Sequence, residues 1–169
     1  VSGGRLEFGV GRGYQSRETE VLGGQMGATV QDQERNRAFF EETYAILLKA
    51  WTEPSFSYEG EFFTIPPTYT KWHHNQTMAY FSQPETGWEL ARVLDLGEPD
   101  PIPNPVPVMA STTRLREISV FPQPLQKPYP QIWQPVASKR SIQWAARHGL
   151  NCHQQLEPIR RLKRNVELF

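Results

Sequence analysis

Cysteine, net charge and long apolar runs are all scarce in this sequence. Its single cysteine, Cys152, cannot form an internal disulfide and offers no Cys-x-x-Cys pair for zinc, which excludes a disulfide-stapled secreted scaffold and a zinc ribbon. The 18 basic and 18 acidic side chains cancel, so charge points neither to nucleic acid nor to a polybasic membrane contact. No run approaches the roughly 18 apolar residues of a membrane span. A soluble protein of the reducing cytoplasm is the expectation.

The composition is otherwise that of a globular protein. Hydrophobic residues fill 38% of the 169 positions, and 12 glycines bring the apolar share to the lower edge of ordinary usage. The chain begins without an initiator methionine and stops inside a helical pattern, so we expect it to be a piece of a longer protein. It is long enough to bury the core of one domain.

The first third of the chain predicts a strand followed by a helix. Apolar and polar residues alternate from 5 to 10, and a glycine-rich turn follows at 9–14. A polar loop is predicted from 15 to about 33. Apolar residues then recur at helical spacing from 40 to 51, and Pro54 ends that helix because proline cannot continue the backbone ladder.

The middle of the chain predicts a hairpin and then a long excursion. Residues 56–62 form the predicted hairpin, which turns at Glu59–Gly60. From 66 to 121 the periodicity is lost, and proline occupies every second position from 99 to 107, which favours an extended polyproline conformation. We expect this insertion to be a surface excursion that acts as a lid. Four of its aromatic residues would either close over an apolar ligand or anchor the loop: Tyr69, Trp72, Tyr80 and Phe81.

The last third predicts a second strand and two helices. A strand-like run covers 131–137, a helix starts at about Ser138, and Gly149 suits the position after the C-terminus of that helix. The next link begins at 150–151, and residues 159–169 carry a further helical stripe. Strands that alternate with helices indicate parallel strands joined by crossover helices, so the α/β class is predicted.

The glycines after the first strand do not complete a dinucleotide-binding fingerprint. That motif opens a helix directly, whereas here Tyr14 stands in the third glycine position and the predicted helix starts about twenty residues later. Arg12 projects from the end of the strand. The turn is therefore either an anion site or a plain tight turn with a solvated arginine.

Arg37 and two serines are the other candidates for anion binding. Arg37, at the start of the predicted helix, opposes the positive end of the helix dipole, so a bound anion would explain its place; pairing with Glu34 or Glu41 is the alternative. Ser138 and Ser141 lie in the first turn of the second helix. Free backbone N–H groups and hydroxyls form a phosphate cradle there, or the serines are an ordinary cap.

No metal or hydrolase signature is present in the sequence. His73–His74 and Cys152–His153 are adjacent pairs whose side chains would face opposite ways on a strand, and neither pair has a third ligand at useful spacing. The sequence contains no G-x-S-x-G, no P-loop and no H-E-x-x-H motif. We therefore expect no bound metal.

Five strings of residues carry a family resemblance. In order and chemistry they resemble the bacterial luciferase-like flavin monooxygenases: 4–14, 37–51, 56–63, 124–133 and 138–149. The last string is similar to that family's fifth strand-to-helix junction. The resemblance implies a (β/α)₈ TIM barrel longer than this chain. Residues 1–169 would then be one fragment of a single barrel domain, containing strands four and five with their helices, and 66–121 would be the insertion between them.

The resemblance also implies a set of cofactor-binding residues. The phosphate of FMN would be held by Arg12, Tyr14, Arg37, Ala137, Ser138 and Ser141. Some relatives carry glutamate where Ala137 stands, but a backbone donor at this position survives the change. The catalytic histidine of the family belongs to an upstream segment that this sequence does not contain, so no catalytic residue is assigned.

The activity implied by the resemblance is a flavin-dependent monooxygenase. Reduced FMN, supplied by a flavin reductase, would react with O₂ and place one oxygen atom on a small organic substrate. Two alternatives remain open at this point: a deazaflavin-dependent oxidoreductase on the same barrel, which transfers hydride, and a non-catalytic flavin-binding remnant. Because the sheet of so short a piece has unpaired edges, we expect the isolated chain to be marginal or self-associating, and a homo-oligomer is left open.

Overall fold

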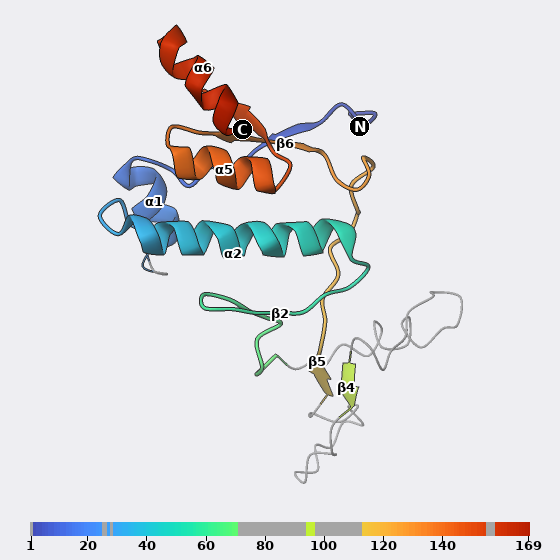
Figure 1. Cartoon of the computed structure of the whole chain (residues 1–169). Helices are drawn as coiled ribbons and strands as arrows, with labels where there is room; N and C mark the ends of the chain where they lie inside the picture. The colour runs from blue at the N-terminus through green and yellow to red at the C-terminus, as the bar shows by residue number, and fades with distance from the viewer. Residues whose placement is uncertain (1, 25–26, 28, 71–93, 97–112, 155–157) are drawn as a thin grey trace. The chain divides into compact units, whose positions relative to one another are not determined.

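The chain divides into two compact units. A computed structural model describes residues 2–24, 27, 29–70, 94–96, 113–154 and 158–169 (Figure 1). The first unit consists of Val1–Glu41 together with Gln123–Phe169, and the second unit is Glu42–Pro122. The second unit is therefore inserted into the sequence of the first. No helix in the described part of the chain is long and apolar enough to cross a membrane.

The first unit is built on a three-stranded parallel sheet. Its strands are β1 (Glu7–Gly9), β6 (Gln131–Pro135) and β7 (Asn151–His153), in the order β1-β6-β7. β1 pairs with the first three residues of β6, and β7 pairs with the last three. Parallel strands with helices between them confirm the predicted α/β class and the two predicted strands, at 5–10 and 131–137.

The third strand, β7, lies where the sequence pattern predicts only a link. Its residues are Asn, Cys and His, and they show no alternation of apolar and polar side chains. The strand forms because β6 offers it a row of backbone partners, and Val136 N also donates to His153 O at 2.9 Å. Pairing with a neighbour, and not local sequence, decides this element.

Cys152 should react slowly with thiol reagents, because β7 partly buries it. Burial raises the pKa of the Cys152 thiol above its ordinary value, since the thiolate loses its solvation. At any given pH a smaller fraction is then thiolate, the reactive form. We expect labelling by iodoacetamide to be at least several-fold slower at pH 8 than in the urea-unfolded chain, and its pH midpoint to lie higher. Equal rates in the two states would contradict this expectation.

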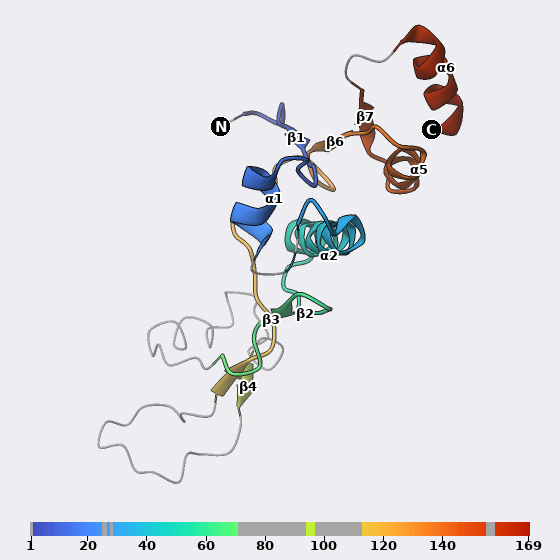
Figure 2. The ribbon, with the colours of Figure 1, turned by 90° about the vertical axis from the view of Figure 1, so that its left-hand side faces the viewer.

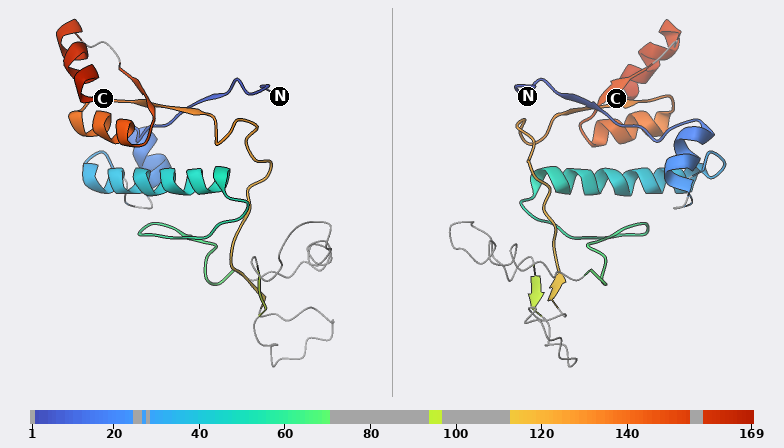
Figure 3. Two further views of the ribbon diagram at one scale, coloured as in Figure 1. Left: turned by 45° about the vertical axis from the view of Figure 1, so that its right-hand side comes forward. Right: turned by 180° about the vertical axis from the view of Figure 1, so that it is seen from behind.

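Helix α5 (Lys139–Arg147) follows β6 as predicted. Its N-cap is Ser138, and Gly149 has φ +66° just after the helix, which confirms the left-handed position predicted for it. The buried residues of this part of the core are Ile142, Trp144, Ala145 and Leu150. Figure 2 views α5 and α2 end-on, and Figure 3 shows α5 between α6 and the first half of α2.

Helix α1 (Ser16–Gly23) occupies part of the segment 15–33, where a loop was predicted. That prediction is wrong for these eight residues. The carboxylate of Glu18 accepts from the backbone N–H groups of Tyr14 (3.1 Å) and Gln15 (3.4 Å), so it caps the first turn. The helix begins on this cap and carries no apolar stripe, and a search for apolar periodicity therefore misses it.

Helix α2 (Gln33–Thr52) begins two turns before the predicted 40–51. Asp32 Oδ1 accepts from the N–H of Arg35 at 2.9 Å, as an N-cap carboxylate does. The first two turns are polar and show no apolar stripe. Arg37 consequently lies in the second turn of the helix and not at its start, which corrects the prediction.

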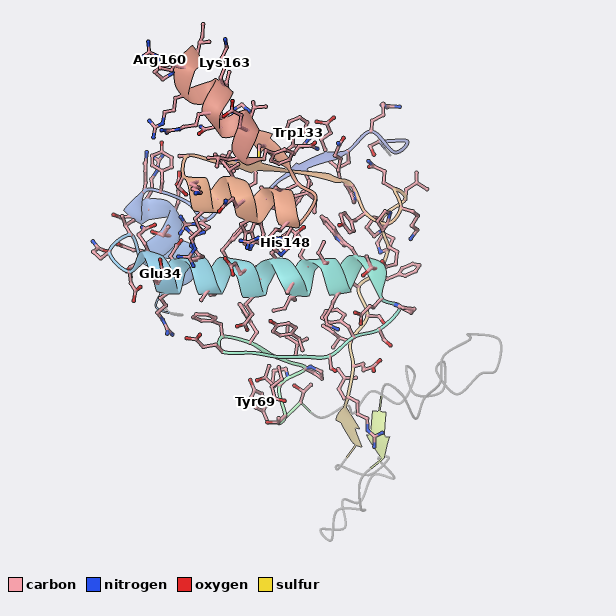
Figure 4. All side chains as sticks on the ribbon, in the orientation of Figure 1. Glu34, Tyr69, Trp133, His148, Arg160 and Lys163 are labelled. Atoms are coloured by element: carbon pink, nitrogen blue, oxygen red, sulfur yellow. The ribbon has the colours of Figure 1, made fainter. Side chains whose placement is uncertain are left out.

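Helix α6 (Ile159–Leu168) confirms the predicted helix in the tail but not a buried apolar stripe. Ile159 and Val166 are 75% and 67% exposed, and the buried residue of the helix is Asn165, whose amide donates to Gln154 Oε1 at 2.8 Å. Figure 4 labels Arg160 and Lys163 on the same helix. The apolar face of α6 has no covering layer within the described residues of the first unit.

The second unit contains two short antiparallel strand pairs. β2 (Tyr58–Glu59) pairs with β3 (Thr64–Ile65), and β4 (Leu94–Leu96) pairs with β5 (Thr113–Leu115). The hairpin predicted at 56–62 is therefore displaced. Its turn is the four-residue segment 60–63, which contains Gly60 of the predicted turn, whereas Glu59 lies in β2.

Most of the predicted excursion 66–121 lies outside the described residues. This applies to the alternating prolines at 99–107 and to the aromatic and histidine residues between 72 and 81. The described end of the excursion pairs with its own unit: Phe56, which is 2% exposed, exchanges two backbone hydrogen bonds of 2.9 Å with Ile118, and Ser119 Oγ donates to Pro54 O at 2.8 Å.

Glu42 holds the loop of the β2–β3 hairpin. This buried carboxylate accepts from three successive backbone N–H groups: Glu61 at 2.9 Å, Phe62 at 3.1 and 3.2 Å, and Phe63 at 2.8 Å. A backbone bond from Gly60 N to Phe63 O, 2.9 Å long, closes the same loop. The anchoring carboxylate comes from α2, outside the hairpin, and this explains why the turn extends from Gly60 to Phe63.

Candidate functional site

A pocket of about 510 Å³ opens in the first unit where β1 and β6 end. Its walls are the loop after β1, the end of β6, the first turn of α5 and His153 at the end of β7. The structure brings together five of the six residues that the sequence placed at a phosphate: Arg12, Tyr14, Ala137, Ser138 and Ser141. Carboxyl ends of parallel strands are the usual place for ligands in α/β folds.

The loop after β1 is shaped by its glycines. Val10 N donates to Trp133 O at 2.8 Å and extends the pairing with β6 by one bond. Gly13 then takes φ +71°, and a Cβ at this position would lie 3.0 Å from Thr19 Cγ2, so a larger residue is disfavoured by both conformation and space. The neighbouring Tyr14 is 77% exposed and its hydroxyl accepts from Gln15 Nε2 at 3.0 Å. The loop thereby turns from the strand into α1 along the pocket wall.

Arg12 is fixed to the start of α2 by one of its terminal nitrogens. Nη1 donates to Asn36 Oδ1 at 3.0 Å and to the side-chain and backbone oxygens of Gln33 at 3.3 and 3.4 Å. Asn36 is buried and returns a bond from Nδ2 to Arg12 O at 3.3 Å. Among the described residues nothing accepts from Nε or Nη2 of Arg12, so these donors are free for a ligand at the pocket.

Arg37 lies near Arg12 but does not line the pocket wall. Its Nε is buried and has no hydrogen-bond partner in the described part of the chain. Partial burial, and after it the charges of Arg37 and then Arg140, lower the pKa of Arg12 below its ordinary value. Three guanidinium groups therefore gather here although like charges repel, which is the arrangement that a bound anion would stabilise.

The start of α5 is capped by its own serines. Ser141 N donates to Ser138 Oγ and Ser138 N to Ser141 Oγ, both at 3.1 Å. Ser141 Oγ also donates to Ser138 O at 2.8 Å. The structure therefore confirms the interpretation of these two serines as a helix cap. The N–H groups of Lys139 and Arg140 precede the first intrahelical bond, from Ile142 to Ser138, so they remain available to an anion.

Three polar residues of the pocket wall were not assigned to the site from the sequence: Glu18, Gln134 and His153. Gln134 is 4% exposed, and its Oε1 has no hydrogen-bond partner among the described residues. A polar residue in the buried register of β6, between Ile132 and Val136, is the signal that could have identified it.

Together these groups give the pocket hydrogen-bond donors of the kind that suit an anion. Guanidinium groups form short, charge-assisted hydrogen bonds to phosphate or carboxylate, and a helix N-terminus adds oriented N–H groups. Water-exposed surface on one side lets the rest of a larger ligand extend away from the anion.

Residues 1–87 match the sequence model of the luciferase-like monooxygenases, and the chain belongs to this family. The family consists mostly of monooxygenases and other oxidoreductases that use flavin or deazaflavin cofactors. The uncharacterized protein y4vJ of Sinorhizobium fredii (strain NBRC 101917 / NGR234) is 38% identical over 68 residues. Those residues are 40% of this chain and 17% of that relative, so the chain corresponds to a small part of the relative's length.

Proposed function

We propose that this chain is the flavin-phosphate-binding part of a flavin-dependent monooxygenase of the luciferase-like family, with FMN as its cofactor. The observation that carries the proposal is that Arg12 and the N-terminus of α5 line one pocket, while the charge of Arg37, whose Nε is buried without an acceptor among the described residues, acts on Arg12 from behind the wall. A terminal phosphate needs several acceptor-seeking donors at one point, and this pocket supplies them.

The residues present fit such a cofactor. Arg12 offers two free nitrogens, Ser138 and Ser141 shape the helix start, and the open side of the pocket leaves room for a ribityl chain and a ring system. Ala137 contributes no polar side chain, so its part in the proposal is a backbone N–H. Tyr14 would cover the cofactor from the loop after β1.

When bound, reduced flavin supplies the electrons with which O₂ is activated and an oxygen atom is passed to an organic substrate. This chain's own residues bind and orient. The arginines fix the phosphate end, and the apolar part of the pocket wall, Pro135 and Val136, limits water beside it. The described residues contain no group to which we assign a proton transfer.

The proposal extends to the whole protein. β1 and β6 would be strands four and five of a TIM barrel, β7 would be the strand that follows them, and the insertion 66–121 would act as a lid. The partners would be a small organic substrate, O₂ and a flavin reductase, in the cytoplasm. Exposed sheet edges and the exposed face of α6 favour association with further copies or with the remainder of a barrel.

The test is a set of titrations of the chain with FMN, riboflavin and 5-deaza-FMN, followed by flavin fluorescence or calorimetry. We expect FMN to bind at least tenfold more tightly than riboflavin, because only FMN carries the phosphate. Oxygen consumption by the photoreduced FMN complex, coupled to oxygenation of an added organic substrate, would support the monooxygenase. Equal binding of FMN and riboflavin would reject the phosphate site. Tight binding confined to the deazaflavin would favour a hydride-transferring oxidoreductase.

A further inference from the structure

Glu34 and Arg140 form an ion pair at the rim of the site. Arg140 Nη1 donates to both oxygens of the carboxylate, to Oε1 at 2.8 Å and to Oε2 at 2.7 Å. Glu34 lies in the first turn of α2 and Arg140 in the first turn of α5. Figure 4 labels Glu34 at the end of α2 where both helices begin. The pair therefore joins the two helices that carry Arg37 and the capping serines.

The ion pair is too exposed to be a major source of stability. The side chains of Arg140 and Glu34 are 55% and 73% exposed, and solvent screens an ion pair at such a position, so the pair contributes little to stability. Its two partners are therefore easily separated. A ligand with more negative charge than a carboxylate can therefore replace Glu34 as the partner of Arg140 at a small cost in free energy.

Glu34 is the carboxylate that faces all three arginines of the site. The hydrogen bond from Arg140 is the largest cause that lowers the pKa of Glu34, and the charges of Arg140, Arg37 and Arg12 lower it further. The charge of Arg140 in turn helps to lower the pKa of Arg12. The charge of Glu41 also acts on Arg12, so two carboxylates stand against three guanidinium groups and neutralise the cluster only in part.

Two unpartnered polar groups indicate that a ligand completes this cluster. Arg37 Nε is a buried donor without an acceptor among the described residues, and an anion would satisfy it. Gln134 is 4% exposed and lines the pocket with its Oε1 unpartnered; this oxygen is an acceptor, so it requires a donor on the ligand, such as a hydroxyl group. The two groups come from α2 and β6, outside the capping interactions of Ser138 and Ser141, so the helix N-terminus is not the sole evidence for a bound ligand.

We propose that Arg140 is a third cationic side chain of the phosphate site and that Glu34 is an internal counter-ion which bound phosphate displaces from it. This inference rests on the proposed function. A guanidinium group donates equally well to a carboxylate or a phosphate, so Arg140 keeps its hydrogen bonds when one replaces the other. The phosphate brings up to two negative charges and more acceptor oxygens, and it satisfies Arg12 and Arg37 at the same time. Glu34 then limits affinity, since it competes for Arg140 and repels the ligand.

The test compares inorganic phosphate, FMN and riboflavin as probes of four chains at one ionic strength, by calorimetry and flavin fluorescence. These are the wild type, Glu34→Gln, Arg140→Met and the double variant. We expect Glu34→Gln to tighten binding of phosphate and FMN by about two- to fivefold and Arg140→Met to weaken it by about three- to tenfold. The gain from Glu34→Gln should shrink to less than half when Arg140 is absent. Riboflavin should bind all four equally.

The matched control is Glu167→Gln on α6, which removes the same charge from an exposed position of the same unit. It should leave all affinities unchanged, and equal gains from Glu167→Gln and Glu34→Gln would overturn the inference by reducing it to net charge. Unchanged phosphate affinity in Glu34→Gln and Arg140→Met, with wild-type phosphate binding intact, would also overturn it and leave the proposed function standing. Absence of phosphate binding in the wild type would reject the proposed function itself. A thermal melt of each variant confirms that the chains compared are folded.

Discussion

Replacing Arg37 with alanine should weaken FMN binding by about 10- to 100-fold and leave riboflavin binding unchanged. The Nε of Arg37 is buried without an acceptor in the described part of the chain, and its charge reaches Arg12 at the pocket. A hydrogen bond to a charged group is worth about 1.5–3 kcal/mol, and each 1.4 kcal/mol is a factor of ten in affinity. Titration of both flavins against both chains, by fluorescence, measures the difference.

The matched control for this prediction is Arg35→Ala. Arg35 lies two positions earlier on α2, is exposed, and carries the same charge. Because alternate helix positions face different ways, its loss should change FMN affinity by less than a factor of two. If Arg37→Ala weakened riboflavin as much as FMN, Arg37 would support the fold of the first unit and would not recognise the phosphate.

Replacing Glu42 with glutamine should destabilise the second unit by about 2–4 kcal/mol. The carboxylate accepts three backbone N–H groups from the hairpin loop, and an amide keeps a single acceptor oxygen while directing an NH₂ group at the remaining donors. Each buried N–H left without a partner costs about 1–3 kcal/mol. Urea unfolding of the variant and the wild type gives the change in free energy. Amide exchange of residues 61–63 reports it locally.

The hairpin provides its own controls. Glu59→Gln, on the exposed strand β2, removes an identical charge and should change stability by less than about 0.5 kcal/mol. Gly60→Ala should act like Glu42→Gln, because a Cβ at Gly60 would lie 2.5 Å from Glu42 Cδ and 2.6 Å from Tyr58 Cε1. If the amides of residues 61–63 exchanged in Glu42→Gln at the wild-type rate, the hydrogen-bond partner of these N–H groups would be water and not the Glu42 carboxylate.

The elements that the sequence predicts well are those whose own side chains specify them. α5 has a serine cap, a buried face and Gly149 after its end, and each of these is readable as a local pattern. β6 is equally clear because Ile132 and Val136 alternate with exposed positions. In both cases propensity, capping and burial agree, so the prediction and the structure coincide.

The elements that the sequence misses depend on partners elsewhere in the chain. β7 is a polar tripeptide that becomes a strand beside β6, and α1 forms on the cap made by Glu18 with Val21 76% exposed. The hairpin turn is moved by Glu42, a residue of another element. An apolar stripe likewise does not guarantee burial: in α6 the buried residue is Asn165. Periodicity contains none of this information.

The residues of the candidate site likewise divide into those that the local sequence identifies and those that depend on distant partners. Arg12, Ser138 and Ser141 stand directly after strands, where sequence order alone brings them to one edge, and the structure places them around one pocket. Gln134 is distinguished by its burial alone, and the partner of Glu34 is Arg140, a residue far away in the sequence that no local pattern connects to it. The role of Arg37 remains a prediction, supported by its buried nitrogen.

The pairing of β1 with β6 also determines when the first unit can fold while the ribosome makes the chain. Glu7 lies opposite Gln131, 124 positions further on. A ribosome that adds about 5–20 residues per second needs roughly 6–25 s to cover that interval, during which β6 is not yet available to β1. The whole of Glu42–Pro122 emerges in the meantime. The pairing of β1 with β6 in the first unit can therefore form only after the second unit has been synthesised.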